Sequence, residues 1–197
     1  MTLLSRINTT LSSLGEGDCG SGKAGQFRGK AQVKTLVLAT RNAGKAREFQ
    51  DLLGSLGWTV LTASQAGYEG EPKETGKTFR ENALIKANEI ATHVPHPVLS
   101  DDSGLEVEAL NGAPGIYSAR FARSNAKDEN NRRKLLAVMR DQTNRRARFV
   151  CVLCFFESGK EPRYFEGICN GNITREERGD SGFGYDPVFI PDSDTRT

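Results

Sequence analysis

Two adjacent carboxylates, Asp101 and Asp102, follow a short apolar run and precede a Ser-Gly pair. Like charges at this spacing destabilise each other unless a cation or a shared proton offsets them. A hard metal ion that also contacts a phosphate is the first such cation that we expect. Asp, Ser and Gly also favour turns, so the alternative is a turn that only reverses the chain. The pair alone does not decide between these interpretations.

A basic segment, Thr40-Arg-Asn-Ala-Gly-Lys45, lies between a predicted strand and a predicted helix. A helix that begins after such a turn directs backbone N–H groups toward an anion. Lys45 adds a positive charge, and Thr40 and Asn42 add hydrogen-bond donors. The segment does not match the G-x-x-x-x-G-K-[ST] pattern of a P-loop. Two interpretations therefore stand, an anion site and an ordinary strand-to-helix turn with Asn42 as the helix cap.

A further candidate is the loop Glu74-Thr-Gly-Lys77, which precedes a helix that begins at the capping box Thr78-Phe-Arg-Glu81. Glu74 is a candidate metal ligand, and Lys86 on the helix is a candidate phosphate contact. Asn82 and Lys86 are i, i+4 neighbours, so the spacing predicts that both reach one ligand. The alternatives are a solvated loop and a surface lysine.

The segment Ser181-Gly-Phe-Gly-Tyr-Asp-Pro187 presents an aromatic ring on a flexible backbone. An aromatic side chain on such a loop suits stacking on a nucleobase, for which Phe183 is the candidate. The carboxylate of Asp186 has the chemistry to accept N–H bonds from a base. The alternative is a glycine-rich turn with a core phenylalanine.

Together these candidates describe a nucleoside triphosphate site. The set assigns Lys45 and Lys86 to phosphates, Glu74 and Asp102 to Mg²⁺, and Phe183 and Asp186 to a base. The two histidines, His93 and His96, offer neither a Ser-His-Asp arrangement nor the spacing of metal ligands.

The elements that must position these residues alternate between strands and helices. Strands are predicted over residues 35–39, 58–61, 98–99, 105–109, 149–156 and 163–173. Helices are predicted after Lys45 with the apolar stripe Phe49, Leu52, Leu53 and Leu56, over 78–92 with Phe79, Ala83, Ala87 and Ile90 inward, and over 128–140 with Leu135, Leu136 and Met139 inside. The turn at 157–160 predicts a hairpin. This order indicates an α/β domain with a mixed sheet.

Length, charge and cysteine usage narrow the class of protein. A chain of 197 residues fits one domain or a bilobal one, and a net charge of +2 is too small to indicate a nucleic-acid or membrane partner. Cys151 and Cys154 lie three apart in a predicted strand and so face opposite ways, which argues against zinc. Free cysteines favour a reducing compartment, the cytoplasm.

Residues 1–34 differ from the rest because their segment 15–25 is glycine-rich and lacks apolar periodicity. We expect a disordered N-terminal extension there. A single early arginine gives only weak support for organelle targeting.

Six segments, in order, resemble the inosine/xanthosine triphosphate pyrophosphatases, the Ham1-like hydrolases of non-standard nucleotides. The segments are 38–45, 74–87, 100–105 with 112–120, 147–149, 173–175 and 182–189. One such match is weak, whereas six in order are highly specific. The resemblance implies an elongated α/β fold with two lobes around a central twisted mixed sheet, a cleft between the lobes, and a homodimer.

The resemblance further implies Mg²⁺-dependent cleavage of ITP, dITP or XTP to the monophosphate and pyrophosphate. It implies catalytic roles for Asp102 as general base and for Lys45 and Lys86, with Glu74 and Asp102 as metal ligands. The substrate-binding residues that it implies are Thr40, Arg41, Asn42, Ala43, Gly44, Lys45, Ser103, Phe183, Gly184, Tyr185 and Asp186.

The sequence departs from the family pattern after the Phe-Gly-Tyr-Asp segment. The family continues with a lysine, a Ser-His-Arg triplet and a closing helix, none of which occurs before Thr197. In the family these residues help to read the 6-oxo group of the base, so the departure bears on base selectivity. It predicts a C-terminally truncated domain over 35–197. The alternative functions are a weakly active or inactive nucleotide-binding remnant and a nucleotide-binding interaction module.

Overall fold

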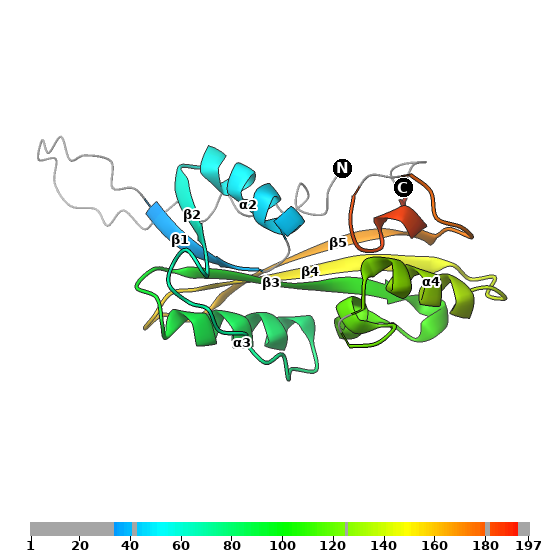
Figure 1. Ribbon diagram of the computed structural model, residues 1–197, viewed down its shortest axis with the longest axis horizontal. Coiled ribbons are helices and arrows are strands. Elements are labelled where there is room, and N and C mark those ends of the chain that lie inside the picture. Colours follow the sequence, from blue (N-terminus) through cyan, green and yellow to red (C-terminus); the bar gives the residue numbers. More distant parts are fainter. Residues whose placement is uncertain (1–33, 41–42, 125, 180–181, 193–197) are drawn as a thin grey trace, which may run out of the picture. The chain divides into compact units, whose positions relative to one another are not determined.

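The computed structural model describes residues 34–40, 43–124, 126–179 and 182–192 (Figure 1). The extension expected over 1–34 lies outside these residues except for Lys34. The strands are β1 Lys34–Ala39, β2 Trp58–Thr62, β3 Val98–Val107, β4 Arg146–Phe156, β5 Arg163–Ile173 and β6 Phe189–Pro191, and the helices are α2 Ala43–Ser55, α3 Phe79–Ala91 and α4 Asp128–Val138. Three short 3₁₀ helices are η2 Glu108–Leu110, η3 Gly115–Arg120 and η4 Asp186–Val188.

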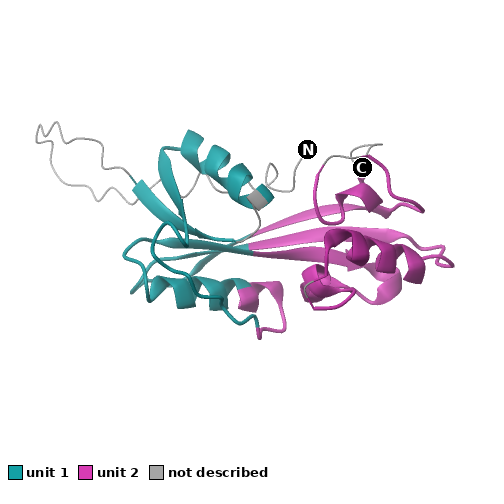
Figure 2. Ribbon diagram, viewed as in Figure 1, with its two compact units in different colours: residues 1–74, 83–101, 153–165 teal, residues 75–82, 102–152, 166–197 magenta. Residues whose placement is uncertain are grey.

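The strands form a six-stranded sheet in the order β2-β1-β3-β4-β5-β6. β1 pairs in parallel with β2 and β3, whereas β5 and β6 are antiparallel. The predicted α/β class with a mixed sheet is therefore confirmed. The chain divides into two compact units (Figure 2). Unit 1 holds the described residues of 1–74, 83–101 and 153–165, and unit 2 holds those of 75–82, 102–152 and 166–197.

In unit 1 the helices α2 and α3 lie on opposite faces of the sheet (Figure 1). Val37 and Ala39 of β1 share a buried apolar cluster with Ala83, Ala87 and Ile90 of α3. The inward stripe predicted for α3 is confirmed, because all of its members are buried. In the apolar stripe predicted for α2, Phe49 and Leu53 are buried as expected. The prediction is wrong for Leu56, which lies directly after the helix and is 37% exposed.

The structure overturns the predicted break in the chain between residues 99 and 105. β3 runs as one strand of ten residues through Asp101, Asp102 and Gly104, with no turn. The physical reason for a glycine at this point is close packing and not chain reversal. A Cβ atom on Gly104 would lie 2.4 Å from the carbonyl oxygen of Gly115 and 2.5 Å from Ser118 Oγ.

This packing makes Gly104→Ala a test of unit 2. Overpacking against the backbone of η3 is expected to lower the free energy of unfolding by about 1–3 kcal/mol, measured by urea denaturation. Gly54→Ala in α2 is the matched control, because its Cβ would have no neighbour within 4 Å. That control is expected to be neutral or to stabilise the chain by up to about 1 kcal/mol. Equal unfolding midpoints for the two variants would contradict the close-packing role of Gly104.

In unit 2, Leu135 of α4 and Met139 directly after it are fully buried as predicted, whereas Leu136 is only partly buried. Cys151, Cys154 and Cys169 are buried thiols. No group of three or more His, Cys, Asp or Glu within the described ranges is placed to hold a metal ion. Among the described helices, none has both the length and the apolar character needed to cross a membrane.

Candidate active site

The first turn of α2 brings Lys45 to a buried carboxylate of β3. Lys45 Nζ donates to Asp101 Oδ2 at 2.5 Å, and the side chains of Lys45 and Asp101 are 22% and 3% exposed. The sheet explains this meeting, because Ala39 at the end of β1 is in register with Ser100 of β3. Thr40 follows Ala39 and Asp101 follows Ser100 along the chain, and Thr40 and Asp101 also form a hydrogen bond. Unit 1 therefore builds a cationic site at the carboxyl end of β1.

The electrostatics of Asp101 show which role this carboxylate serves. Burial raises its pKa, because a charged group loses solvation. The positive charges of Lys45 and Lys86, together with hydrogen bonds from Lys45 and Thr40, outweigh burial and bring the pKa of Asp101 below its ordinary value. Asp101 is therefore an ionised partner that holds the lysines in place and a poor proton acceptor.

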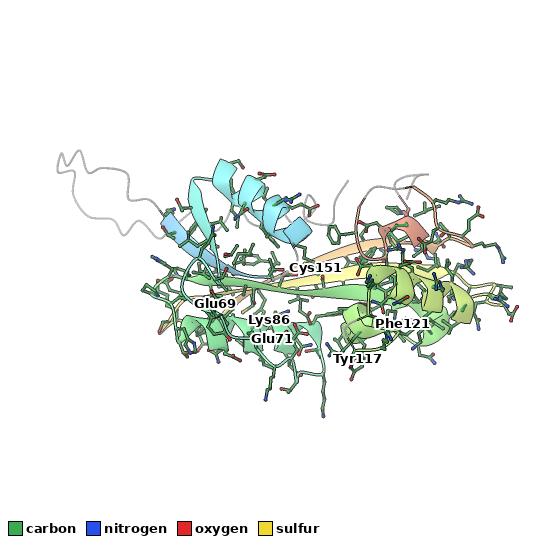
Figure 3. The ribbon with its side chains drawn as sticks, viewed as in Figure 1. Glu69, Glu71, Lys86, Tyr117, Phe121 and Cys151 are labelled. Atoms are coloured by element: carbon green, nitrogen blue, oxygen red, sulfur yellow. The ribbon has the colours of Figure 1, made fainter. Side chains whose placement is uncertain are left out.

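A second ion pair joins the loop before α3 to the helix itself. Lys86 lies on α3 (Figure 3), and its Nζ donates to Glu74 Oε1 at 2.9 Å. The side chains of Lys86 and Glu74 are 14% and 29% exposed. Unit 1 thus contains two lysines and two carboxylates in one charge cluster: Lys45, Asp101, Lys86 and Glu74.

The N-terminus of α3 anchors the loop that follows Glu74. The predicted capping box is confirmed, since Glu81 N donates to Thr78 Oγ1 at 3.1 Å. Asn82 Oδ1 accepts the N–H of Gly76 at 2.9 Å, and its side chain is fully buried. Asn82 Oδ1 therefore serves the backbone of the loop, and that Asn82 and Lys86 reach one ligand stays a prediction.

Asp102 and Ser103 belong to unit 2. Side chains alternate along a strand, so Asp102 points to the face opposite Asp101. Ser100 shares that face with Asp102, and its hydroxyl donates to the carbonyl oxygen of Ala83 on α3 at 2.6 Å. The adjacent carboxylates are therefore separated by the sheet, which is how the chain accommodates two like charges in sequence. Asp102 is buried, with 9% of its surface exposed, and Ser103 is partly exposed.

The loop at residues 182–188 of unit 2 is built around hydrogen bonds to its own backbone. Phe183 is half-buried, its N–H donates to Asp186 Oδ2 at 3.0 Å, and its carbonyl accepts the N–H of Asp186 at 3.1 Å. Tyr185 is 5% exposed and its hydroxyl donates to the carbonyl oxygen of Ser118 at 2.8 Å. Tyr185 and one oxygen of Asp186 thus hold the loop in shape, and Phe183 is the ring that the loop presents.

Burial governs the acid–base state of the same loop. It raises the pKa of Asp186, and the negative charge of Asp128 raises it further, while the hydrogen bond from Phe183 lowers it. Burial likewise raises the pKa of the Tyr185 hydroxyl, with Asp128 as the second cause. The tyrosine is therefore a neutral hydrogen-bond donor at neutral pH.

The structure brings together some of the predicted site residues within each unit. Unit 1 groups Thr40, Lys45, Lys86 and Glu74, and Gly44 lies beside Lys45 in the first turn of α2. Arg41 and Asn42 lie outside the described residues, and Ala43 is described only as the start of α2. Asp101 is the residue whose role sequence reasoning missed. A lysine in the first turn after one parallel strand and an aspartate at the end of its neighbour is the signal that could have found the pair.

Comparison with known proteins identifies close relatives of this chain. A family model described as the Ham1 family matches residues 36–197. A dITP/XTP pyrophosphatase of an Exiguobacterium species is 48% identical over 155 residues, covering 79% of this chain and 79% of the relative. A dITP/XTP pyrophosphatase of Salmonella typhimurium is 44% identical over 171 residues, covering 84% of this chain and 85% of the relative.

Solved structures show the same relationship. The Ham1 protein of Staphylococcus aureus is similar with a TM-score of 0.75 and 41% identity, covering 83% of this chain and 84% of that one. A Ham1 protein of Coxiella burnetii has a TM-score of 0.77 and 40% identity, covering 83% and 85%. The arrangement of strands and helices and the matched length agree, so the chain belongs to the Ham1 family.

Proposed function

We propose that this chain is an enzyme that hydrolyses non-standard purine nucleoside triphosphates, such as ITP, dITP and XTP, to the monophosphate and pyrophosphate. The observation that carries the proposal is the cluster of Lys45, Lys86, Asp101 and Glu74, in which two carboxylates hold two lysines that phosphate oxygens would pair with. Relatives named dITP/XTP pyrophosphatases at 48% and 44% identity support this substrate class. The substrate that the reaction removes from the nucleotide pool is a deaminated purine triphosphate.

The triphosphate binds at the N-terminus of α2 and at the two lysines. The first turn of α2 contains no acidic residue, so its N–H groups are available to an anion without a competing charge nearby in sequence. Thr40, Arg41, Asn42, Ala43 and Gly44 supply the backbone and side-chain donors of this turn. When the triphosphate binds, Lys45 and Lys86 exchange part of their pairing with Asp101 and Glu74 for pairing with phosphate oxygens.

Asp102 acts as the general base, and Ser103 contacts the substrate. A carboxylate takes the proton of a water molecule whose oxygen attacks the α-phosphorus. The new bond to the α-phosphorus forms as the bond from that phosphorus to the bridging oxygen of pyrophosphate breaks. Lys45 and Lys86 neutralise the charge that develops on the leaving pyrophosphate, since positioning and electrostatics supply most of the catalysis in such transfers.

Glu74 and Asp102 would hold Mg²⁺, which would offset charge on the triphosphate when bound. Their donor chemistry fits this ion, because Mg²⁺ takes oxygen ligands and is usually bound by one or two carboxylates together with substrate phosphates.

The base is held by the loop that includes Phe183, Gly184, Tyr185 and Asp186. The ring of Phe183 stacks on the purine, and Tyr185 and Asp186 keep the loop in the shape that presents it. We also propose a homodimer, which light scattering tests, and a reducing compartment such as the cytoplasm, which buried cysteine thiols suit.

Hydrolysis of ITP in water enriched in ¹⁸O tests the reaction type. Attack at the α-phosphorus is expected to place the label in the monophosphate and none in pyrophosphate, measured by mass spectrometry of both products. Label in pyrophosphate would show attack at the β-phosphorus, and release of inorganic phosphate alone would show a different hydrolysis. Either result would contradict the proposed reaction.

A further inference from the structure

Helix α4 holds both polar backbone groups of one residue in the loop that presents Phe183. Gly184 N–H donates to Asp128 Oδ2 at 2.9 Å, and the Gly184 carbonyl accepts from Arg132 Nη1 at 2.9 Å. Asp128 and Arg132 are four residues apart on α4, so they lie on one face of the helix. We call these two side chains the Gly184 clamp.

Gly184 is a point at which the loop needs such a clamp. Its φ of +61° is in the left-handed region, and a Cβ there would have no neighbour within 4 Å. A glycine without packing has the largest choice of backbone conformations, so packing does not fix this position. Asp186 holds the backbone of Phe183 on one side of Gly184, and the hydroxyl of Tyr185 holds the residue on its other side. The clamp fixes Gly184 itself, directly next to Phe183.

A further hydrogen bond holds the Arg132 side chain of the clamp. Arg132 Nε donates to Glu177 Oε2 at 3.0 Å, and only 15% of the Arg132 side chain is exposed. Asp128 lies in the first turn of α4, where the helix dipole favours a carboxylate. Hydrogen bonds from charged groups to backbone atoms are stronger than neutral ones. Glu177 therefore orients the Arg132 side chain, while Asp128 is an exposed carboxylate at the helix end that favours its charge.

We propose that Asp128 and Arg132 are positioning residues for recognition of the base, acting through Gly184 on Phe183. The proposal rests on the proposed function, because it assigns the presented ring to the purine. A role in stability alone would weaken every ligand in proportion to the fraction of chain that unfolds. A positioning role instead weakens ligands that carry a base and leaves ligands that carry only phosphates unchanged.

Arg132→Gln tests the clamp, with Arg133→Gln as the matched control. Arg133 is the next residue on α4, and its ion pair with Glu129 is exposed and does not touch the loop. Calorimetry would measure the Kd for ITP and for inorganic tripolyphosphate with Mg²⁺ present, in an Asp102→Asn background that turns substrate over slowly. For Arg132→Gln, we expect the Kd for ITP to rise about tenfold, a change of about 1.4 kcal/mol, with the Kd for tripolyphosphate unchanged. Arg133→Gln is expected to change neither Kd.

A pair of substitutions at Asp128 supplies the second readout. Asp128→Asn keeps an oxygen that accepts from Gly184 N–H, so it is expected to retain most of the ITP affinity, whereas Asp128→Ala is expected to lose it to the same extent as Arg132→Gln. An unchanged Kd for ITP in both Arg132→Gln and Asp128→Ala would overturn the clamp. An equal rise in the Kd for ITP and for tripolyphosphate would also overturn it. Wild-type protein that binds ITP without cleaving it would contradict the proposed reaction and leave this binding comparison intact.

Discussion

Replacing Asp102 with Asn is expected to lower kcat for ITP hydrolysis by about 10²- to 10⁴-fold, the range over which a general base contributes. The amide has nearly the shape of the carboxylate but does not take a proton from water at neutral pH. A continuous assay of pyrophosphate release measures the change. Thermal unfolding of the variant is expected to stay close to that of the wild type, since β3 keeps its hydrogen bonds and its packing.

Asp101→Asn is the matched control for that substitution. Asp101 and Asp102 are consecutive and both buried, but Asp101 serves Lys45 on the other face of β3. The same chemical change at Asp101 is expected to lower stability and to leave a proton acceptor in place. Near-normal turnover in Asp102→Asn would remove Asp102 from the role of general base.

Lys45→Met is expected to have the largest effect on stability. It leaves the buried Asp101 carboxylate without its nearest positive charge, which in a buried pair destabilises the fold by about 3–5 kcal/mol. Because the Lys45 side chain is 22% exposed, solvent screens its charge in part, and the expected loss in the free energy of unfolding is roughly 2–4 kcal/mol. Urea denaturation measures it, and the same variant is expected to lose affinity for the triphosphate.

The double variant Lys45→Met with Asp101→Asn separates the ion pair from the packing of each side chain. It is expected to recover much of the lost stability, because neither charge is then buried alone. Simple addition of the two single effects would show that the pair contributes nothing. The sign of the pH dependence follows from the lowered pKa of Asp101. The contribution of the pair is expected to be complete above the ordinary pKa of a carboxyl and to be lost as the pH falls through the lowered value.

Local patterns predicted most of the elements correctly. The capping box at Thr78 fixes the start of α3, and the apolar spacing of Phe79, Ala83 and Ile90 fixes the face that it buries. Those patterns depend on residues within a few positions of one another, so the predictions made from them stay correct in the folded chain. The same reasoning failed at Leu56, because α2 ends at Ser55 and the helical spacing no longer applies to the next residue.

Long-range contacts explain what the sequence did not show. A turn at Asp101–Gly104 is the local preference of those residue types, but Asp101 meets Lys45 from 56 positions earlier in the chain, and Gly104 meets Gly115 and Ser118. Those contacts keep β3 extended. The residue types around Phe183 correctly indicated a loop. The hydrogen bond from the Tyr185 hydroxyl to Ser118 depends on contacts between distant parts of the chain, which no local pattern predicts.

The most direct test measures pyrophosphate released from ITP, XTP, GTP and ATP by the full chain, with and without Mg²⁺. We expect fast pyrophosphate release from ITP and XTP that depends on Mg²⁺, slow release from GTP and ATP, and loss of release in Asp102→Asn. A folded chain that binds these nucleotides and releases no pyrophosphate from any of them would contradict the proposed hydrolysis.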